Sequence, residues 1–93
     1  MQRILFVCLG NICRSPAAQV VFGELAKDAG QKVFIDSAGT SGWHIGDPPY
    51  DPMIRAAAQR GYDLADLRAR AFDRSDFDDF RAFRVQFEAY PAA

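Results

Sequence analysis

The chain has 93 residues, of which 49% are hydrophobic and 25% charged, and eleven basic against twelve acidic residues leave a formal net charge of -1. This length and composition predict one small globular domain, residues 1–93, and exclude a disordered tail. The balanced charge offers no basic surface to nucleic acid or to an anionic membrane, and no stretch approaches the roughly 20 apolar residues of a membrane span, so neither partner is expected.

The first predicted element is a strand over residues 3–7, RILFV, a continuous apolar run that is typical of a central parallel strand buried on both faces. A helix is predicted after it, with Ser15 as the N-cap, Pro16 as the first helical residue and Gly30 as the stop. The buried face of this helix is predicted from apolar residues at helical spacing: Ala18, Val21, Phe22, Leu25, Ala26 and Ala29.

A second strand is predicted over residues 32–38, KVFIDSA, so the first three elements form a βαβ unit with parallel strands and a right-handed crossover. A loop rich in Gly and Pro follows, and then a second helix over residues 53–60. Residues 73–80 fit one helical turn with Ser75 as its cap. In residues 81–90 the apolar side chains fit both strand and helix spacing, and a strand is favoured.

Residues 8–15, CLGNICRS, join the first strand to the first helix and contain Cys8 and Arg14 with five residues between them. The N–H groups at a helix start, placed at the end of a parallel strand, form a favourable site for a phosphate group. Facing these N–H groups and a guanidinium, the thiol of Cys8 would be held as a thiolate that attacks phosphorus. Arg14 would hold two oxygens of the phosphoryl group while charge shifts in the transition state. These two residues are therefore the predicted catalytic pair.

The neighbouring residues have predicted supporting tasks. Gly10 lets the backbone approach the anion, and Asn11 tolerates a left-handed conformation while its amide ties the loop together. The hydroxyl of Ser15 would donate to the sulfur of Cys8. Cys13 would trap an oxidised Cys8 as a reversible disulfide.

The same residues also allow a simpler interpretation. A cysteine after a buried strand is most often a small core residue, and the bare Cys-x5-Arg spacing occurs by chance in many chains. The preceding strand, the Gly-Asn pair and the Arg-Ser-Pro sequence favour phosphate binding. Two cysteines in one loop form no disulfide framework, which favours the reducing cytoplasm. One histidine and two loop cysteines form no metal-ligand set, and no cofactor is expected.

Three segments resemble the low-molecular-weight protein tyrosine phosphatases: VCLGNICRSP, DSAGTSGWHIGDPP and IRAAAQRGYDL, within a similarity that covers residues 2–80. The resemblance implies an α/β fold of the flavodoxin-like or phosphotyrosine-phosphatase-I-like type, a parallel sheet of four strands with flanking helices. It implies that Cys8 forms a phosphocysteine intermediate and that Arg14 binds phosphate. It also implies a phosphate-binding loop formed and supported by Leu9, Gly10, Asn11, Ile12, Cys13 and Ser15.

The loop after the second strand contains further candidates. The resemblance implies that Trp43 lines a rim where the aromatic ring of a substrate stacks, with an aromatic that covers the core as an equal alternative. His44 is interpreted as a structural or surface histidine, and Asp36 as part of the strand end. Neither Asp47 nor Asp51 is taken as the general acid.

The sequence departs from the family pattern after residue 80. The later strand of the family, its Asp-Pro loop with the general acid and its final helix have no match in residues 81–93, which we interpret as the divergent tail of a truncated or altered member. Without the acid, hydrolysis of phosphotyrosine should fall by the ~10²–10⁴-fold typical of general acid catalysis, while substrates with good leaving groups still react. A sheet of two or three strands would leave an apolar face and a strand edge uncovered, which predicts a homo-oligomer.

The leading prediction is therefore impaired hydrolysis of a phosphotyrosine protein or a small aryl phosphate, with inorganic phosphate or another oxyanion binding in the loop. A non-catalytic phosphate- or phosphotyrosine-binding module remains open. So do a thiol-dependent arsenate reductase, for which no cysteine lies beyond Cys13, and a remnant with no function of its own. Turnover separates the leading prediction from the binding module.

Overall fold

The computed structural model describes residues 1–80 and the backbone of residues 82–85. The elements follow in the order β1 (Gln2–Cys8), α1 (Arg14–Asp28), β2 (Val33–Gly39), α2 (Asp51–Gln59), α3 (Asp76–Asp79) and β3 (Ala82–Val85). The strand favoured for the tail is confirmed over Ala82–Val85, and the rest of that prediction lies outside the described residues.

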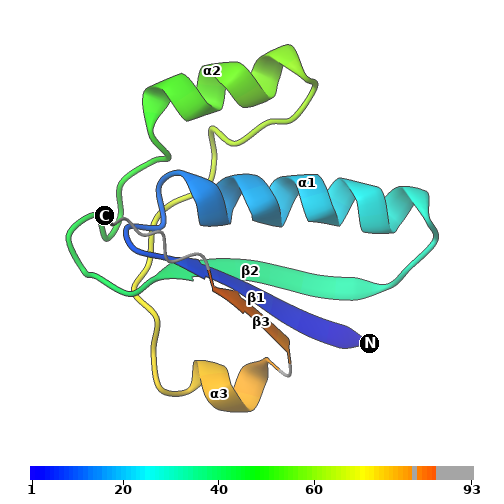
Figure 1. Ribbon diagram of the computed structural model, residues 1–93, viewed down its shortest axis with the longest axis vertical. Helices are drawn as coiled ribbons and strands as arrows, with labels where there is room; N and C mark the ends of the chain where they lie inside the picture. Colours follow the sequence, from blue (N-terminus) through cyan, green and yellow to red (C-terminus); the bar gives the residue numbers. More distant parts are fainter. Residues whose placement is uncertain (81, 86–93) are drawn as a thin grey trace.

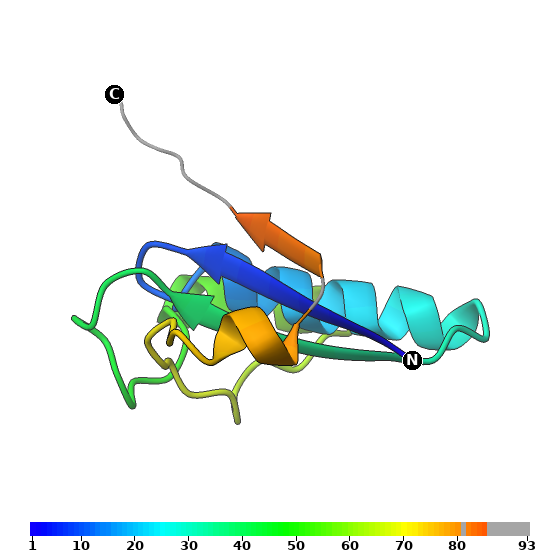
Figure 2. The same ribbon diagram turned by 90° about the horizontal axis from the view of Figure 1, so that it is seen from below.

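The described strands form one parallel sheet in the order β2-β1-β3, with β1 in the centre. Helix α1 lies on one side of this sheet and α3 on the other, while α2 lies beyond α1 (Figure 1). The view from below shows the three strands side by side with their arrows pointing the same way (Figure 2). The predicted βαβ unit and the parallel sheet with flanking helices are thus confirmed.

Strand β1 is buried on both faces, as its continuous apolar run predicted. All five residues from Ile4 to Cys8 are buried. On one face Leu5 and Val7 form a core cluster with Ala38 and Phe80. Because side chains alternate along a strand, Phe6 points to the other face, where its ring lies 5.8 Å from the ring of Phe22 in α1. The strand that ends at Cys8 is therefore fixed from both sides.

The predicted start of the first helix was wrong. Helix α1 begins at Arg14, the N-cap residue is Cys13, and no side chain caps the helix. Ser15 is therefore a residue of the helix itself, and its hydroxyl contacts Cys8 and Asn11 in the preceding loop. The predicted stop is confirmed, because Gly30 follows the C-cap with a φ of 72°, in the left-handed region that favours glycine.

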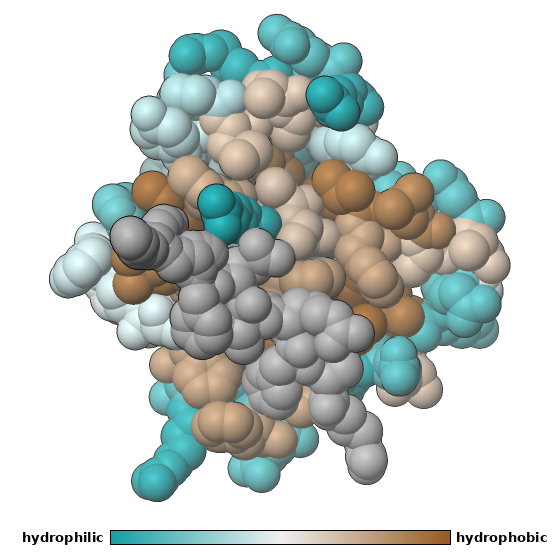
Figure 3. All heavy atoms as spheres, viewed as in Figure 1, coloured by the Kyte–Doolittle hydropathy of each residue, from teal (hydrophilic) through white to brown (hydrophobic). Residues whose placement is uncertain are grey.

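The predicted buried face of α1 was only partly right. Ala26 is buried, whereas Phe22 is partly exposed and Leu25 is 57% exposed. The described strands that α1 packs against are β1 and β2, and they cover one side of the helix. Apolar surface consequently appears over α1 in Figure 3.

The second helix starts earlier than predicted. Helix α2 begins at Asp51 and has a proline in its first turn, where a missing N–H costs nothing. The helical turn predicted near residue 76 is confirmed as α3, which follows Ser75 without a side-chain cap.

Candidate active site

The segment from Cys8 to Ser15 crosses from the carboxyl end of β1 to the start of α1, at the left of Figure 1. Segments distant in sequence hold it by main-chain hydrogen bonds. The N–H of Thr40 donates to the carbonyl oxygen of Cys8 at 2.9 Å, and that of Ser41 donates to Leu9 at 2.9 Å. The N–H of Tyr50 donates to the carbonyl oxygen of Ile12 at 2.7 Å. The loop is therefore clamped by the chain that follows β2.

Cys8 is buried at the start of this loop, with 7% of the residue exposed. The main-chain N–H of Asn11 donates to Sγ at 3.3 Å, and Oγ of Ser15 lies 3.0 Å from the same sulfur. The N–H donates to the sulfur, and the hydroxyl can donate to it as well; both hydrogen bonds would stabilise a negative sulfur. The predicted contact between Ser15 and Cys8 is present.

Asn11 adopts the left-handed conformation that the sequence suggested, with a φ of 58°. It is buried, with 3% of the residue exposed. Its amide nitrogen donates to the hydroxyl oxygen of Ser15 at 2.7 Å and to that of Ser37 at 3.0 Å. Its amide oxygen accepts from the main-chain N–H of Arg70 at 2.9 Å. The side chain thus ties the loop to α1, to β2 and to the segment before α3.

Sequence reasoning missed Ser37, Gln19 and Arg70 as partners of the loop. Ser37 accepts from Asn11 and donates to Oε1 of Gln19 at 2.6 Å. The signal available in the sequence was the polar pair Asp-Ser inside an otherwise apolar strand, since a buried polar side chain requires a partner. No comparable local signal marks Arg70.

The other predicted loop residues surround the thiol in different ways. Arg14 is the first residue of α1 and is exposed, as is Leu9, while Ile12 and Cys13 are half-buried. Burial raises the pKa of the Cys13 thiol, as does the charge of Cys8, and Arg14 opposes both effects. Cys13 therefore stays a neutral thiol at neutral pH.

Trp43 is 76% exposed, so the alternative in which it covers the core was wrong. Leu9, Ile45 and Tyr50 are also exposed. Of these, Leu9 belongs to the loop, and the main chain of Tyr50 contacts it at Ile12. Whether Trp43 stacks on a substrate ring stays a prediction.

His44 lies over the loop, because a Cβ added to Gly10 would come within 3.1 Å of the His44 ring. Its Nδ1 lies 3.2 Å from Oδ2 of Asp47. Asp51 pairs with Arg55 on the surface of α2. Asp36 accepts from Nε of Arg70 at 3.1 Å and lies in the middle of β2, so its interpretation as a strand-end residue was wrong.

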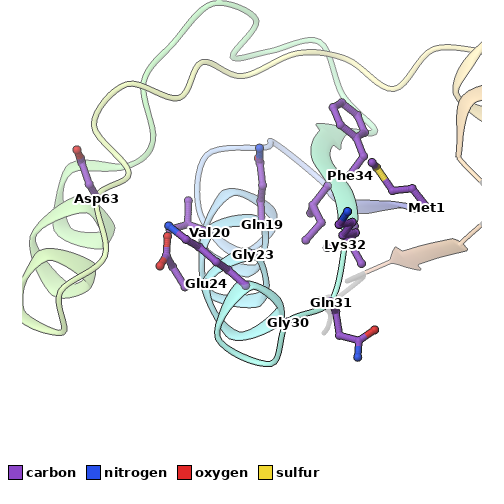
Figure 4. A pocket seen from close by; sticks show the side chains of 13 residues that line it. Met1, Gln19, Val20, Gly23, Glu24, Gly30, Gln31, Lys32, Phe34 and Asp63 are labelled. Carbon is purple, nitrogen blue, oxygen red and sulfur yellow. The ribbon is translucent and has the colours of Figure 1, made fainter.

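A separate groove of about 880 Å³ lies along α1 and β2, and no residue from 8 to 15 lines it. Figure 4 shows Gln19, Val20 and Glu24 on α1, with Lys32 and Phe34 at β2. In the described part of the chain, no group of three or more His, Cys, Asp or Glu residues is placed to hold a metal ion. Nor does that part contain a helix long and apolar enough to cross a membrane.

The parallel sheet with flanking helices defines an α/β protein. Its central strand ends in a loop that contains a thiol and leads into a helix, an arrangement typical of anion-binding sites. Comparison with known proteins gives the family. The sequence model described as "Low molecular weight phosphotyrosine protein phosphatase" matches residues 3–82. The chain belongs to this family.

One curated relative is the low molecular weight protein-tyrosine-phosphatase YfkJ of Bacillus subtilis, which is 45% identical over 82 residues. The match covers 86% of this chain and 53% of that protein, so the chain spans about half the length of this relative.

Solved structures agree with the fold. The crystal structure of YfkJ superposes with a TM-score of 0.89 at 42% identity, covering 94% of this chain and 56% of that one. A protein tyrosine phosphatase of Entamoeba histolytica, with Hepes in its active site, superposes with a TM-score of 0.87 at 37% identity. It covers 91% of this chain and 55% of its own.

Proposed function

We propose that the chain carries the catalytic loop of a phosphatase that hydrolyses aryl phosphate monoesters, with phosphotyrosine as the substrate class. Cys8 is the nucleophile and Arg14 binds the phosphoryl oxygens. The observation that carries the proposal is the environment of the Cys8 sulfur, which has an N–H donor at 3.3 Å and a hydroxyl at 3.0 Å. The names of the relatives support the same activity.

The reaction has two steps. In the first, the thiolate of Cys8 attacks phosphorus, so a sulfur–phosphorus bond forms while the bond to the aryl oxygen breaks and its electron pair leaves with the phenolate. In the second, water attacks the phosphocysteine, and inorganic phosphate and the thiolate are released. Loop N–H groups and the guanidinium of Arg14 stabilise the charge on the equatorial oxygens in both steps.

The substrate's phosphoryl group would lie among residues Leu9 to Cys13, and its ring beside the exposed Trp43. The Hepes named in the Entamoeba structure is a sulfonate buffer, which is consistent with an oxyanion site in that protein. We propose that the loop from Cys8 to Ser15 in this chain likewise binds oxyanions.

No described residue is assigned as the general acid. The aspartates of the two Asp-Pro pairs have other partners, since Asp47 pairs with His44 and Asp51 pairs with Arg55. The 93 residues assayed by themselves should therefore hydrolyse activated aryl phosphates readily. Phosphotyrosine, whose phenolate needs a proton, should be slower by roughly 10²–10⁴-fold than in an enzyme that supplies one.

We place the protein in the cytoplasm and propose that this chain self-associates. Two free cysteines support a reducing compartment. The partly exposed apolar side chains of Phe22 and Leu25 on α1 support association between copies.

The test of the proposed function is release of the phenol from para-nitrophenyl phosphate by the purified chain, with Cys8→Ser as the control. Turnover that the control lacks supports the proposal. Inorganic phosphate binding without turnover in the parent would contradict it and favour a non-catalytic phosphate-binding module.

A further inference from the structure

Arg70 is at the centre of a cluster of ion pairs with Asp76 and Asp36. Its two terminal nitrogens donate to the two carboxylate oxygens of Asp76, at 3.0 and 2.9 Å, and its Nε donates to Asp36 at 3.1 Å. The side chain of Asp76 is 5% exposed and also accepts the main-chain N–H of Asp73 at 2.8 Å. A guanidinium that donates hydrogen bonds to this many acceptor atoms is held in one position and orientation.

Both members of the central pair are charged at neutral pH. Burial acts to raise the pKa of Asp76, but hydrogen bonds from Arg70 and from the N–H of Asp73 outweigh it and lower that pKa. The hydrogen bond to Asp76 raises the pKa of Arg70. A buried charge is costly without its partner, so the side chain of Arg70 is held in place.

The backbone at Arg70 is connected to the end of β2. Its carbonyl oxygen accepts from the N–H of Gly39 at 2.8 Å, and the N–H of Phe72 donates to Gly39 at 2.7 Å. Ala71 forms a parallel bridge with Gly39. In the parallel pairing of β1 with β2, Gly39 lies opposite Cys8. The ion pairs of Arg70 therefore fix a backbone segment one strand away from the thiol.

The main-chain N–H of Arg70 then sets the orientation of Asn11. That N–H donates at 2.9 Å, so the atom facing it must be the amide oxygen of Asn11. The amide nitrogen must then face Ser15 and Ser37, to which it donates. Because the oxygen of Ser15 accepts from Asn11, the single hydroxyl proton of Ser15 is available to the sulfur of Cys8 at 3.0 Å.

We infer that Arg70 is a positioning residue for the Cys8 loop: its ion pairs with Asp76 and Asp36 place a main-chain N–H that orients Asn11, and Asn11 directs the Ser15 hydroxyl to the sulfur. The inference deepens the proposed function, since it concerns how the proposed nucleophile is kept as a thiolate. In this arrangement Arg70 acts on the sulfur through Asn11 and Ser15.

The test is the pH dependence of Cys8 alkylation by iodoacetamide, read at Cys8 by fragmenting the peptide that contains it. This measurement needs no turnover. The variant is Arg70→Met, which removes the ion pairs and leaves the backbone N–H in the chain. The matched control is Arg55→Met, which also removes an arginine–aspartate pair, but one on the exposed surface of α2.

In Arg70→Met the midpoint pH of alkylation should rise by roughly 0.5 to 1 unit, the size of one weakened hydrogen bond to a charged group. The Arg55→Met midpoint should not move. An unmoved midpoint in folded Arg70→Met would overturn the inference and leave Arg70 a purely structural residue. A lower melting temperature of Arg70→Met with an unmoved alkylation midpoint would likewise overturn the inference.

The path through Asn11 is tested with Asn11→Gly, because glycine accepts the positive φ at this position. In the Asn11→Gly background, Arg70→Met should shift the midpoint by less than 0.2 unit, about the precision of such a titration. A shift of the same size in both backgrounds would overturn the path.

If Arg70→Met does not fold, Asp36→Ala removes a single, half-exposed partner and is judged by the same midpoint, with a rise expected and no change overturning the inference. The assay with para-nitrophenyl phosphate separates this inference from the proposed function. A moved alkylation midpoint without turnover in the parent supports the positioning role and contradicts phosphatase activity.

Discussion

Gly39 at the end of β2 lies directly against Gly10 in the cysteine loop: a Cβ at position 39 would lie 3.0 Å from the carbonyl carbon of Gly10 and 3.0 Å from the carbonyl oxygen of Leu9. A contact of 3.0 Å is tighter than most real Cβ contacts, so the loop backbone would have to move by a few tenths of an ångström. The absent side chain of Gly39 is therefore a condition for the loop to reach its position beside β2. Because the φ of Gly39 is not positive, the requirement is steric rather than conformational.

Gly39→Ala should displace the loop and destabilise the chain by about 1–3 kcal/mol, the usual cost of overpacking. Phosphate affinity should fall with it, because the loop N–H groups move. Urea unfolding and titration with inorganic phosphate measure the two effects. Gly23→Ala is the matched control, since its nearest contact would be an ordinary 3.9 Å and alanine favours a helix. Equal behaviour of the two variants would contradict the steric argument.

Acid should destabilise the chain through Asp76. Its pKa is lowered in the folded state, so its contribution to stability is complete above the ordinary carboxyl pKa of about 4 and is lost as the pH falls below that value. Asp76→Asn cannot lose this contribution, and its urea midpoint should change less than that of the parent between pH 5 and pH 3. Parallel curves for the two proteins would show that Asp76 has no such role.

Cys13 should protect an oxidised Cys8. Peroxide converts the Cys8 thiolate to a sulfenic acid, and the thiol of Cys13 then condenses with it to give a disulfide and water. After peroxide treatment and then dithiothreitol, the parent should recover a labelable Cys8, whereas Cys13→Ala should lose much of it to further oxidation. Equal recovery in the two chains would remove Cys13 from this role. Two labelable cysteines before oxidation serve as the reference state.

Self-association should depend on the exposed side of α1. Leu25 is 57% exposed, and Leu25→Lys places a charge at this position of α1 without touching the sheet core. Light scattering should give a mass above that of one 10.3 kDa chain for the parent and a lower mass for the variant. A monomeric parent at working concentrations would contradict the prediction of a homo-oligomer.

The sequence predicted the local features of the site and missed the long-range ones. The apolar run of β1, the position of the cysteine at its end and the left-handed Asn11 all follow from neighbouring residues, and all are present. Ser15 was assigned two tasks, and only one is compatible with its position, because its hydroxyl contacts Cys8 and Asn11 rather than capping the helix.

Arg70 could not be found in this way. It lies 59 positions from Asn11, and its contact with that residue is made by its main chain, which every residue type except proline can supply. The exposure of Leu25 was also missed, since helical spacing identifies an apolar face but not what covers it.

The account depends most on Cys8 as a nucleophile, and the most direct test is to trap the phosphocysteine. The chain is mixed with para-nitrophenyl phosphate, quenched rapidly in acid and measured by intact mass, with Cys8→Ser and Cys13→Ala in parallel. The account predicts one added phosphoryl group in the parent and in Cys13→Ala, located on Cys8 by fragmentation, and none in Cys8→Ser. Release of the phenol by the parent without a phosphoryl group on Cys8 in any quenched sample, or the same adduct in Cys8→Ser, would contradict it.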